Sequence, residues 1–303
     1  MRLGDLELLS LTDGFFALDG GAMFGVVPKV LWQRTNPPDD RNRVRLAMRP
    51  LLIRARGALV LVDTGIGRKQ DAKFQDMYKV EHTNHLVASL EKAGWRPEEV
   101  THVVNTHLHF DHSGGNTKRV ESGRSTDRLV PAFPNAKYYI QRREWEAATR
   151  PDMRSRASYL QENFIPIQEA GQLELLDGDK EVAPGVTVVL TGGHTNGHQL
   201  VILEAEGTAS GTRTEDNAKR KAIYWGDLIP TTTHVKVPYV MAYDTMPLVT
   251  MEQKEKLLKL VADEHWLMFF EHDPAISSGH LVEERGKYAV RIQSADGLTQ
   301  ISD

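Results

Sequence analysis

The chain contains no cysteine among its 303 residues. Disulfide bonds, thiolate metal sites and thiol nucleophiles are therefore excluded, although the redox compartment stays undetermined. No run of residues approaches the roughly 18 apolar residues that a membrane span needs. The N-terminal stretch MRLGDLELLSLTDG carries charges every few residues and has no apolar centre, so it does not resemble a signal peptide. We therefore expect a cytoplasmic protein without a membrane partner.

A surplus of basic residues is also absent. The 37 Lys and Arg residues against 41 Asp and Glu residues give a net charge of −4. Without a basic stripe we expect no nucleic-acid partner. Hydrophobic residues make up 40% of the chain and charged residues 26%, as in ordinary soluble proteins. No linker is long enough to force two domains, so we expect a single domain over residues 1–303.

Apolar segments of strand length dominate the first third of the chain and recur later. Predicted strands cover residues 6–11, 45–55, 58–62, 102–105, 136–140, 186–190 and 266–270. Hairpins are predicted at the turn Arg56-Gly57 and between residues 201–204 and 222–224. Predicted helices cover residues 85–93, with Gly94 as the stop, 142–149 and 250–263. The polar residues 117–130 and 206–221 predict loops.

Several of these strands end close to a histidine or an aspartate. The five residues are Asp63, His107, His194, Asp227 and His272. Functional sites are commonly built at strand ends and in the loops that follow them, because the scaffold there is rigid. We therefore expect these side chains to converge at one edge of a sheet.

The densest cluster of donors is the segment NTHLHFDHSGGN, residues 105–116. Side chains alternate in an extended segment, so His107 and His109 point the same way and can bind one ion. Asp111 continues that alternation, whereas His112 breaks it and can turn toward a second ion. Imidazole and carboxylate donors without thiolates suit Zn, Mn, Fe or Co.

The donors are too numerous for one tetrahedral ion. The seven candidate metal ligands are His107, His109, Asp111, His112, His194, Asp227 and His272. Two ions that share a bridging carboxylate would use all of them and leave room for water. We therefore expect two divalent metal ions, with zinc favoured.

The stretch THLHFDH resembles the HxHxDH signature of the metallo-β-lactamase superfamily. The stretches LVDTG, GHTNGH, YWGDLIP and FFEHD resemble that superfamily's other motifs, in its order, so that the resemblance covers nearly the whole chain. It implies an α+β protein with the four-layer αββα sandwich. It also implies that His107, His109 and His194 hold one ion, that Asp111, His112 and His272 hold the other, and that Asp227 bridges them. Asp63 would hold the ligand loop in place without touching an ion.

A closer resemblance is to YtnP-like quorum-quenching lactonases and the methyl parathion hydrolase group, through GGAMFGVVPKVLW and GDLIPTTTHVKVPYVMAYD. Related acyl-homoserine lactonases place a tyrosine three residues after the bridging Asp, where it assists the substrate carbonyl. Here that position is Pro230. His234, Tyr239 or Tyr243 can supply the donor instead. We take His234, with Asp111 and Asp227, as the candidate catalytic residues.

Two further features have competing interpretations. His198 repeats the GxxGH rhythm, but we expect a packed or hydrogen-bonded histidine and not a ligand. Phe15, Phe16, Met23 and Phe24 can be ordinary core residues. Because they lie in a Gly-rich segment, we favour residues 14–32 as a lid or as a homodimer contact over an apolar pocket.

The resemblance implies a hydrolase in which a metal-bridging hydroxide attacks a carbonyl carbon, with Asp111 as a proton shuttle. A lactone, such as an N-acyl-homoserine lactone, is the favoured small-molecule substrate. An organophosphate triester or aryl ester is the alternative. A β-lactam fits less well, because the likeness is to the lactonase branch. A non-catalytic metal-binding protein is the least favoured, since unused donors would form a buried and poorly satisfied polar cluster.

Overall fold

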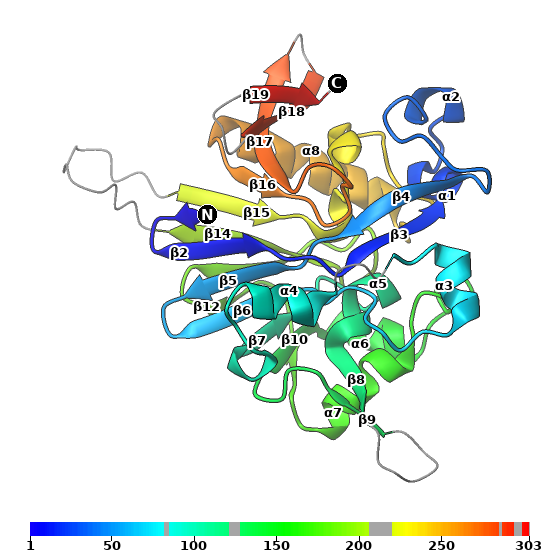
Figure 1. Cartoon of the computed structure of the whole chain (residues 1–303). Coiled ribbons are helices and arrows are strands. Elements are labelled where there is room, and N and C mark those ends of the chain that lie inside the picture. The colour runs from blue at the N-terminus through cyan, green and yellow to red at the C-terminus, as the bar shows by residue number, and fades with distance from the viewer. Residues whose placement is uncertain (82–84, 121–127, 206–219, 285–286, 294–298, 303) are drawn as a thin grey trace, which may run out of the picture.

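The computed structural model describes residues 1–81, 85–120, 128–205, 220–284, 287–293 and 299–302. Two large β-sheets face each other and carry helices on their outer faces (Figure 1). The predicted polar loop at 206–221 lies almost wholly outside the described residues. None of the helices in the described residues is long and apolar enough to span a bilayer.

The first sheet is built mainly from the N-terminal half of the chain. Its seven strands, in spatial order, are β1 (Arg2–Leu3), β2 (Leu6–Ser10), β5 (Leu51–Ala55), β6 (Ala58–Val62), β7 (His102–Val104), β10 (Lys137–Gln141) and β11 (Leu173–Leu176). β5 and β6 form the predicted hairpin around Gly57, whose φ of 76° suits a residue without a Cβ. β6, β7 and β10 run parallel, so their C-terminal ends lie at the same edge.

The second sheet is built from the C-terminal half. In spatial order its eight strands are β12 (Lys180–Ala183), β13 (Val186–Leu190), β14 (Gln199–Ala205), β15 (Arg220–Tyr224), β16 (Leu267–Phe269), β17 (Ser278–Glu284), β18 (Lys287–Gln293) and β19 (Thr299–Ser302). The predicted pairing of residues 201–204 with 222–224 is confirmed as β14 and β15. β15 and β16 run parallel, which aligns the loops that follow Tyr224 and Phe269.

Helices and short strands complete the layers. The helices are α1 (Gly20–Phe24), α2 (Lys29–Trp32), α3 (Ala72–Tyr78), α4 (Leu86–Lys92), α5 (Phe110–Ser113), α6 (Arg142–Thr149), α7 (Ile165–Glu169) and α8 (Pro247–Asp263). Single 3-10 turns cover Pro97–Glu99, Gly114–Asn116, Gln161–Asn163, Gly226–Leu228 and Thr232–Val235. Two small ribbons consist of β3 (Gly14–Asp19) with β4 (Arg43–Met48), and β8 (Thr117–Val120) with β9 (Arg128–Pro131).

Three buried apolar clusters explain the order of the layers. One fills the space between the sheets, with Ile53, Val62 and Val201 among its members. A second lies between the first sheet and α4, α6 and α7, and a third lies between the second sheet and α8. In Figure 1, α4, α6 and α7 are on one side of the paired sheets and α8 is on the other. The predicted αββα sandwich is therefore confirmed.

Two predictions of secondary structure were wrong. Residues 45–55 form two strands in different sheets, β4 and β5, because Pro50 has no N–H to donate to a ladder and the chain turns at Arg49-Pro50. Residues 117–130, predicted as a loop, contribute β8 and most of β9 to a ribbon. Alternating polar residues on an exposed ribbon give no hydrophobic signal by which a strand can be predicted.

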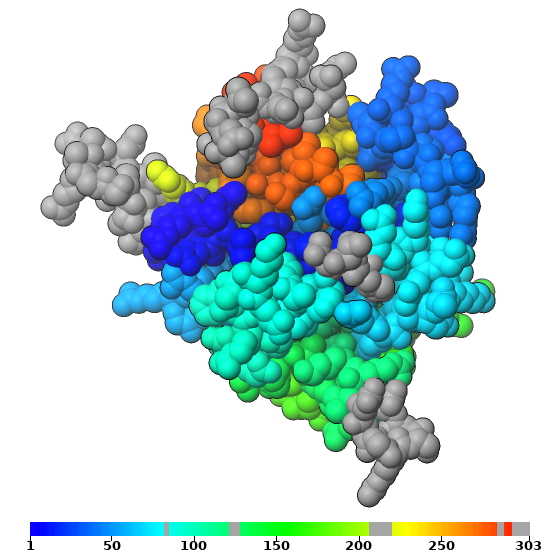
Figure 2. All heavy atoms as spheres, viewed as in Figure 1, coloured from blue at the N-terminus to red at the C-terminus, as the bar shows by residue number. Residues whose placement is uncertain are grey.

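The segment 14–32 folds as β3, α1 and α2. Phe16, Met23 and Phe24 are buried in a cluster with Trp32, whereas Val26 is 86% and Val30 is 61% exposed. Figure 2 shows the blue N-terminal residues on the surface between the orange C-terminal strands and the cyan residues around α3 and α4. The aromatic residues of the segment are thus mostly core residues, and the exposed apolar residues lie further along, around α2.

Candidate metal centre

The strand ends predicted from the sequence meet at one edge of the sandwich that the two sheets form. The first sheet supplies Asp63 after β6 and the 105–113 loop after β7. The second sheet supplies His194 after β13, Asp227 after β15 and His272 after β16. All seven candidate ligands are buried, the most exposed being His109 at 7%. Neither sheet alone could build this cluster.

The donor atoms fall into two groups that share a neighbour. His107, His109 and His194 form the first ligand group, and Asp111, His112 and His272 form the second. In each group the donor atoms lie within 4.8 Å of one another. The groups match the sets predicted for the two ions.

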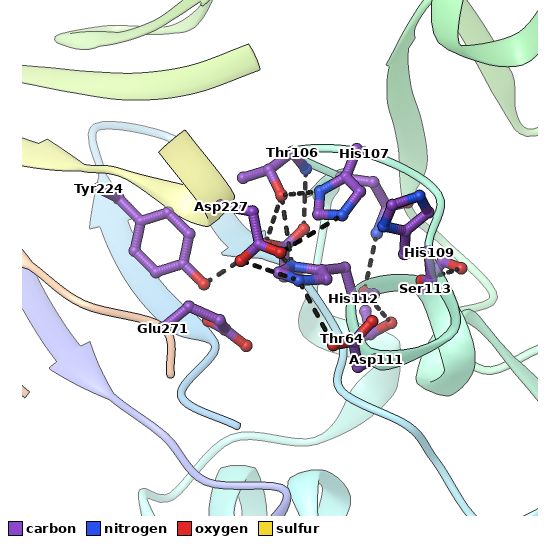
Figure 3. Close-up of polar contacts among 12 residues, drawn as sticks. Thr64, Thr106, His107, His109, Asp111, His112, Ser113, Tyr224, Asp227 and Glu271 are labelled. Atoms are coloured by element: carbon purple, nitrogen blue, oxygen red, sulfur yellow. Dashed lines mark hydrogen bonds and ion pairs between the residues drawn. The ribbon is translucent and has the colours of Figure 1, made fainter. Parts of the chain in front are cut away.

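Asp227 lies between the two groups, and Figure 3 shows its carboxylate beside His107 of the first group and His112 of the second. Its Oδ2 is 3.3 Å from His194 Nε2 and 3.9 Å from His107 Nε2. Its Oδ1 is 3.2 Å from His272 Nε2 and 3.4 Å from His112 Nε2. One carboxylate oxygen thus faces each group, as a bridging ligand requires.

Hydrogen bonds orient three of the imidazole rings from the side that faces away from the centre. His112 Nδ1 donates to Asp63 Oδ2 at 3.0 Å, His194 Nδ1 to Asp244 Oδ1 at 2.8 Å, and His272 Nδ1 to the carbonyl of Ala47 at 2.7 Å. These partners accept hydrogen bonds, so Nδ1 of each of the three rings carries a proton and Nε2 points to the centre.

The imidazole nitrogens at the centre are too close together to remain without a proton or a metal cation between them. His112 Nε2 and His272 Nε2 are 3.0 Å apart, and His194 Nε2 is 3.1 Å from His109 Nδ1. His107 Nε2 and Asp227 Oδ1 are buried without a hydrogen-bond partner in the described residues. Such a set of converging lone pairs and orphaned atoms fits divalent cations with imidazole and carboxylate ligands.

The electrostatics of the centre show how strongly its carboxylates attract positive charge. Burial opposes protonation of His112, His194 and His272, but the carboxylates, Asp227 first among them, outweigh it and raise the pKa of each ring, to about 9 for His272. Burial and the neighbouring imidazoles hold the pKa of His107 well below its ordinary value, which keeps its lone pair free. Burial opposes ionisation of Asp227, but His112, His272 and His194 outweigh it and hold the pKa of that carboxyl well below its usual range. Asp227 is therefore an anion.

Asp63 holds the ligand loop, in agreement with the role implied by the resemblance. Its Oδ1 accepts from Thr106 N at 2.8 Å, and its Oδ2 accepts from Thr106 Oγ1 at 2.8 Å as well as from His112. The residue has a φ of 58°, a left-handed conformation that Asp tolerates better than most residues. The backbone turns here so that the carboxylate points back at the loop after β7.

His198 is a hydrogen-bonded histidine, as predicted. Its Nε2 accepts from the backbone N of Asp227 at 3.1 Å, and its Nδ1 lies 2.7 Å from Thr191 Oγ1. Both nitrogens are used, and the ring holds Asp227 through its main chain. Pro230 has a comparable role, since its carbonyl accepts from the backbone N of His272.

The side chain of His234 does not face the two ligand groups. Its Nε2 lies 2.9 Å from the carbonyl of Met23, its Nδ1 lies 2.8 Å from Thr231 Oγ1, and its ring stacks on Phe24. Burial lowers the pKa of His234 to about 4, so the ring is neutral. These contacts indicate that His234 anchors α1 through Met23 and Phe24. The catalytic role of His234 stays a prediction.

A pocket of about 160 Å³ opens above the centre. Its polar wall includes His109, Asp111, His194, Asp227 and His272. Its other wall consists of Leu18, Met23, Tyr78, Phe110, Arg154, Ala157, Ser158, Met241 and Tyr243. A mainly apolar chamber over a polar floor suits a substrate with one reactive polar group and an apolar remainder.

Sequence reasoning missed the side chains that hold the ligands. Asp244, which orients His194, is buried and ends the quoted stretch YVMAYD. Glu144 and Thr106 were also missed. An acidic residue beside apolar neighbours is a weak signal of such a role, because the sequence does not show which imidazole it will face.

Comparisons with known proteins agree with this geometry. A family model described as the metallo-beta-lactamase superfamily matches residues 50–208. An N-acyl homoserine lactonase from Bacillus cereus is 28% identical over 242 residues, which cover 77% of this chain and 83% of that protein. A probable metal-dependent hydrolase from Staphylococcus aureus has a TM-score of 0.82 and 30% identity, covering 92% of this chain and 94% of that one. The dizinc quorum-quenching lactonase AidC has a TM-score of 0.71 at 22% identity, covers 95% and 94% of the two chains, and supports the fold alone.

Proposed function

The chain belongs to the metallo-beta-lactamase superfamily and is a hydrolase, and on that premise we propose that it opens the ring of an N-acyl homoserine lactone. The observation that carries the proposal is the convergence of imidazole nitrogens from both sheets on the two oxygens of Asp227. The curated relative named as an N-acyl homoserine lactonase supports the substrate class.

We propose that the first ligand group holds one divalent ion, the second group holds another, and Asp227 bridges them. Zinc is the favoured metal, because imidazole and carboxylate donors suit it and AidC is a dizinc enzyme. When bound, the ions would lower the pKa of a shared water and polarise the lactone carbonyl. The residues around them then orient the substrate and move the proton.

We propose that Asp111 accepts that proton. Its Oδ2 is 3.6 Å from His272 Nε2, and its side chain lines the pocket. Leu18, Met23 and Met241 form the apolar wall on which an acyl chain can pack. Since Leu18 and Met23 belong to the segment 14–32, we propose that this segment is a wall of the substrate pocket. The dimer role stays a prediction.

Tyr243 is the best-placed donor among the three that the sequence left open. It lines the pocket, whereas Tyr239 packs its ring edge against Phe24 and both nitrogens of His234 have protein partners. Burial, followed by Tyr78 and Asp111, raises the pKa of Tyr243, so its hydroxyl remains protonated at neutral pH. We propose that this hydroxyl donates to the carbonyl oxygen as negative charge develops on it.

Replacing Tyr243 with Phe should therefore lower kcat by on the order of 100-fold and leave KM nearly unchanged, because the lost hydrogen bond forms only as the oxyanion develops. Steady-state kinetics on an acyl-homoserine lactone measures both constants. Tyr239→Phe is the matched control and should behave as wild type. Equal activity of the two variants would exclude Tyr243 as the donor.

The proposed function is tested by proton release in a pH-stat, with a medium-chain and a long-chain acyl-homoserine lactone. We expect turnover that stops after chelation of metal and returns when zinc is added. A fully metallated protein that turns over neither lactone would rule out this substrate class. Phosphotriesters and aryl esters, which the same nucleophile can attack, would then be assayed.

A further inference from the structure

A buried carboxylate from a third segment joins the two loops that carry the first ligand group. Glu144, in the first turn of α6, is 1% exposed. Its Oε1 accepts from Leu108 N at 2.9 Å and from the hydroxyl of Tyr159 at 3.0 Å, and its Oε2 accepts from Thr195 Oγ1 at 2.5 Å. We propose that Glu144 is a positioning residue that sets the separation of these loops and thereby determines the affinity of the first ion. This inference rests on the metal centre proposed above.

Each partner of Glu144 lies next to a ligand of the first group. Leu108 stands between His107 and His109, and Thr195 follows His194. The Tyr159 ring lies 5.0 Å from the ring of His109, measured between centroids. The hydrogen bonds therefore act at all three histidines of the first group. The ligands of the second group are held by other partners, Asp63 for His112 and Ala47 for His272.

The packing around Glu144 shows independently that the loop after His194 is in close contact with the start of α6. A Cβ at Gly197 would come within 2.2 Å of the backbone N of Glu144. Only glycine fits at such a distance, so the loop after His194 lies directly on the start of α6.

The partners also explain why a carboxylate is present. Leu108 N donates, the hydroxyls of Tyr159 and Thr195 are turned toward the carboxylate, and all three groups are neutral. Burial of a carboxylate without a paired cation is costly, and burial indeed raises the pKa of Glu144 while these hydrogen bonds lower it. A site that needed only rigid packing could use an apolar side chain at lower cost. The charge is useful because two oxygens can hold three donors from separate segments.

The test is the zinc content of Glu144→Ala after dialysis against a low concentration of free zinc, with cobalt titration to follow each site by absorption. Wild type should retain two ions per chain. Glu144→Ala should retain one, with about 10- to 100-fold weaker binding of the other, as is typical when a group that orients metal ligands is removed. Asp13→Ala is the matched control. Asp13 is also a buried carboxylate, but it accepts from the backbone N of Gly67 and of Leu86. It should retain two ions.

Thr195→Val provides a milder variant in case Glu144→Ala does not fold. It removes one hydrogen-bond donor with little change of shape, and it should weaken binding of the first ion less than Glu144→Ala does. Two ions held with wild-type affinity in folded Glu144→Ala or in Thr195→Val would overturn the proposal, and so would an equal loss of metal in Asp13→Ala. A wild-type chain that binds no zinc would instead overturn the metal centre itself, which separates that failure from a failure of Glu144 alone.

Discussion

Replacing Asp227 with Asn should lower lactone hydrolysis by at least roughly a thousandfold and reduce the metal content below two ions per chain. Each oxygen of Asp227 faces one ligand group, at 3.2 to 3.9 Å from the imidazole nitrogens. An amide offers one oxygen and one NH₂ group, so it can face only one ion as an acceptor. The amide also lacks the negative charge that balances two cations.

Metal analysis and pH-stat assays on the same preparation measure the two expected losses together. Asp13→Asn is the control, since it makes the same chemical change at another buried carboxylate. An Asp227→Asn protein with two ions and full activity would remove the bridging role. A folded variant with one ion and little activity would support it, and the near-UV circular dichroism spectrum would establish that the fold is intact.

Replacing Asp63 with Asn should weaken binding of the second ion by about 100-fold, although Asp63 is not itself a proposed ligand. The carboxylate accepts from His112 Nδ1, which keeps the proton on that nitrogen and the lone pair on Nε2. With Thr106 N still donating to the amide oxygen, the NH₂ group would face His112. The ring would then change tautomer and present a protonated Nε2 to the metal.

Asn is chosen because, like Asp, it tolerates the left-handed backbone at this position, where φ is 58°. The thermal midpoint of the metal-free protein should therefore stay close to the wild-type value, whereas the zinc affinity falls. Competition with a zinc chelator measures the affinity, and one-bond ¹H–¹⁵N spectra of the imidazoles report the tautomer of His112. Unchanged zinc affinity, or a proton that stays on Nδ1, would exclude this role of Asp63.

The candidate ligands could be named from the sequence because they share a simple local context. His107, His109, Asp111 and His112 lie within six positions, and Asp227 and His272 each follow an apolar strand. Parallel neighbouring strands place their C-terminal ends at one edge, so strand-end residues converge whenever their strands pair. The hairpin at Gly57 and the helix at residues 86–92 were likewise predicted from local signals.

The composition, the strand pattern and the motifs were thus sufficient to predict the αββα layers and to name donors that the structure brings together, because hydrophobic periodicity and donor chemistry are properties of short segments. Only the tertiary structure decided which partner each buried polar group meets. It separated β4 from β5 at Pro50, turned His234 toward Met23 and brought Tyr243 to the pocket. It also placed Asp244 behind His194 and Glu144 between two loops. A carboxylate can accept from any nearby donor, so its partner depends on how distant segments pack and is not encoded in the residues around it.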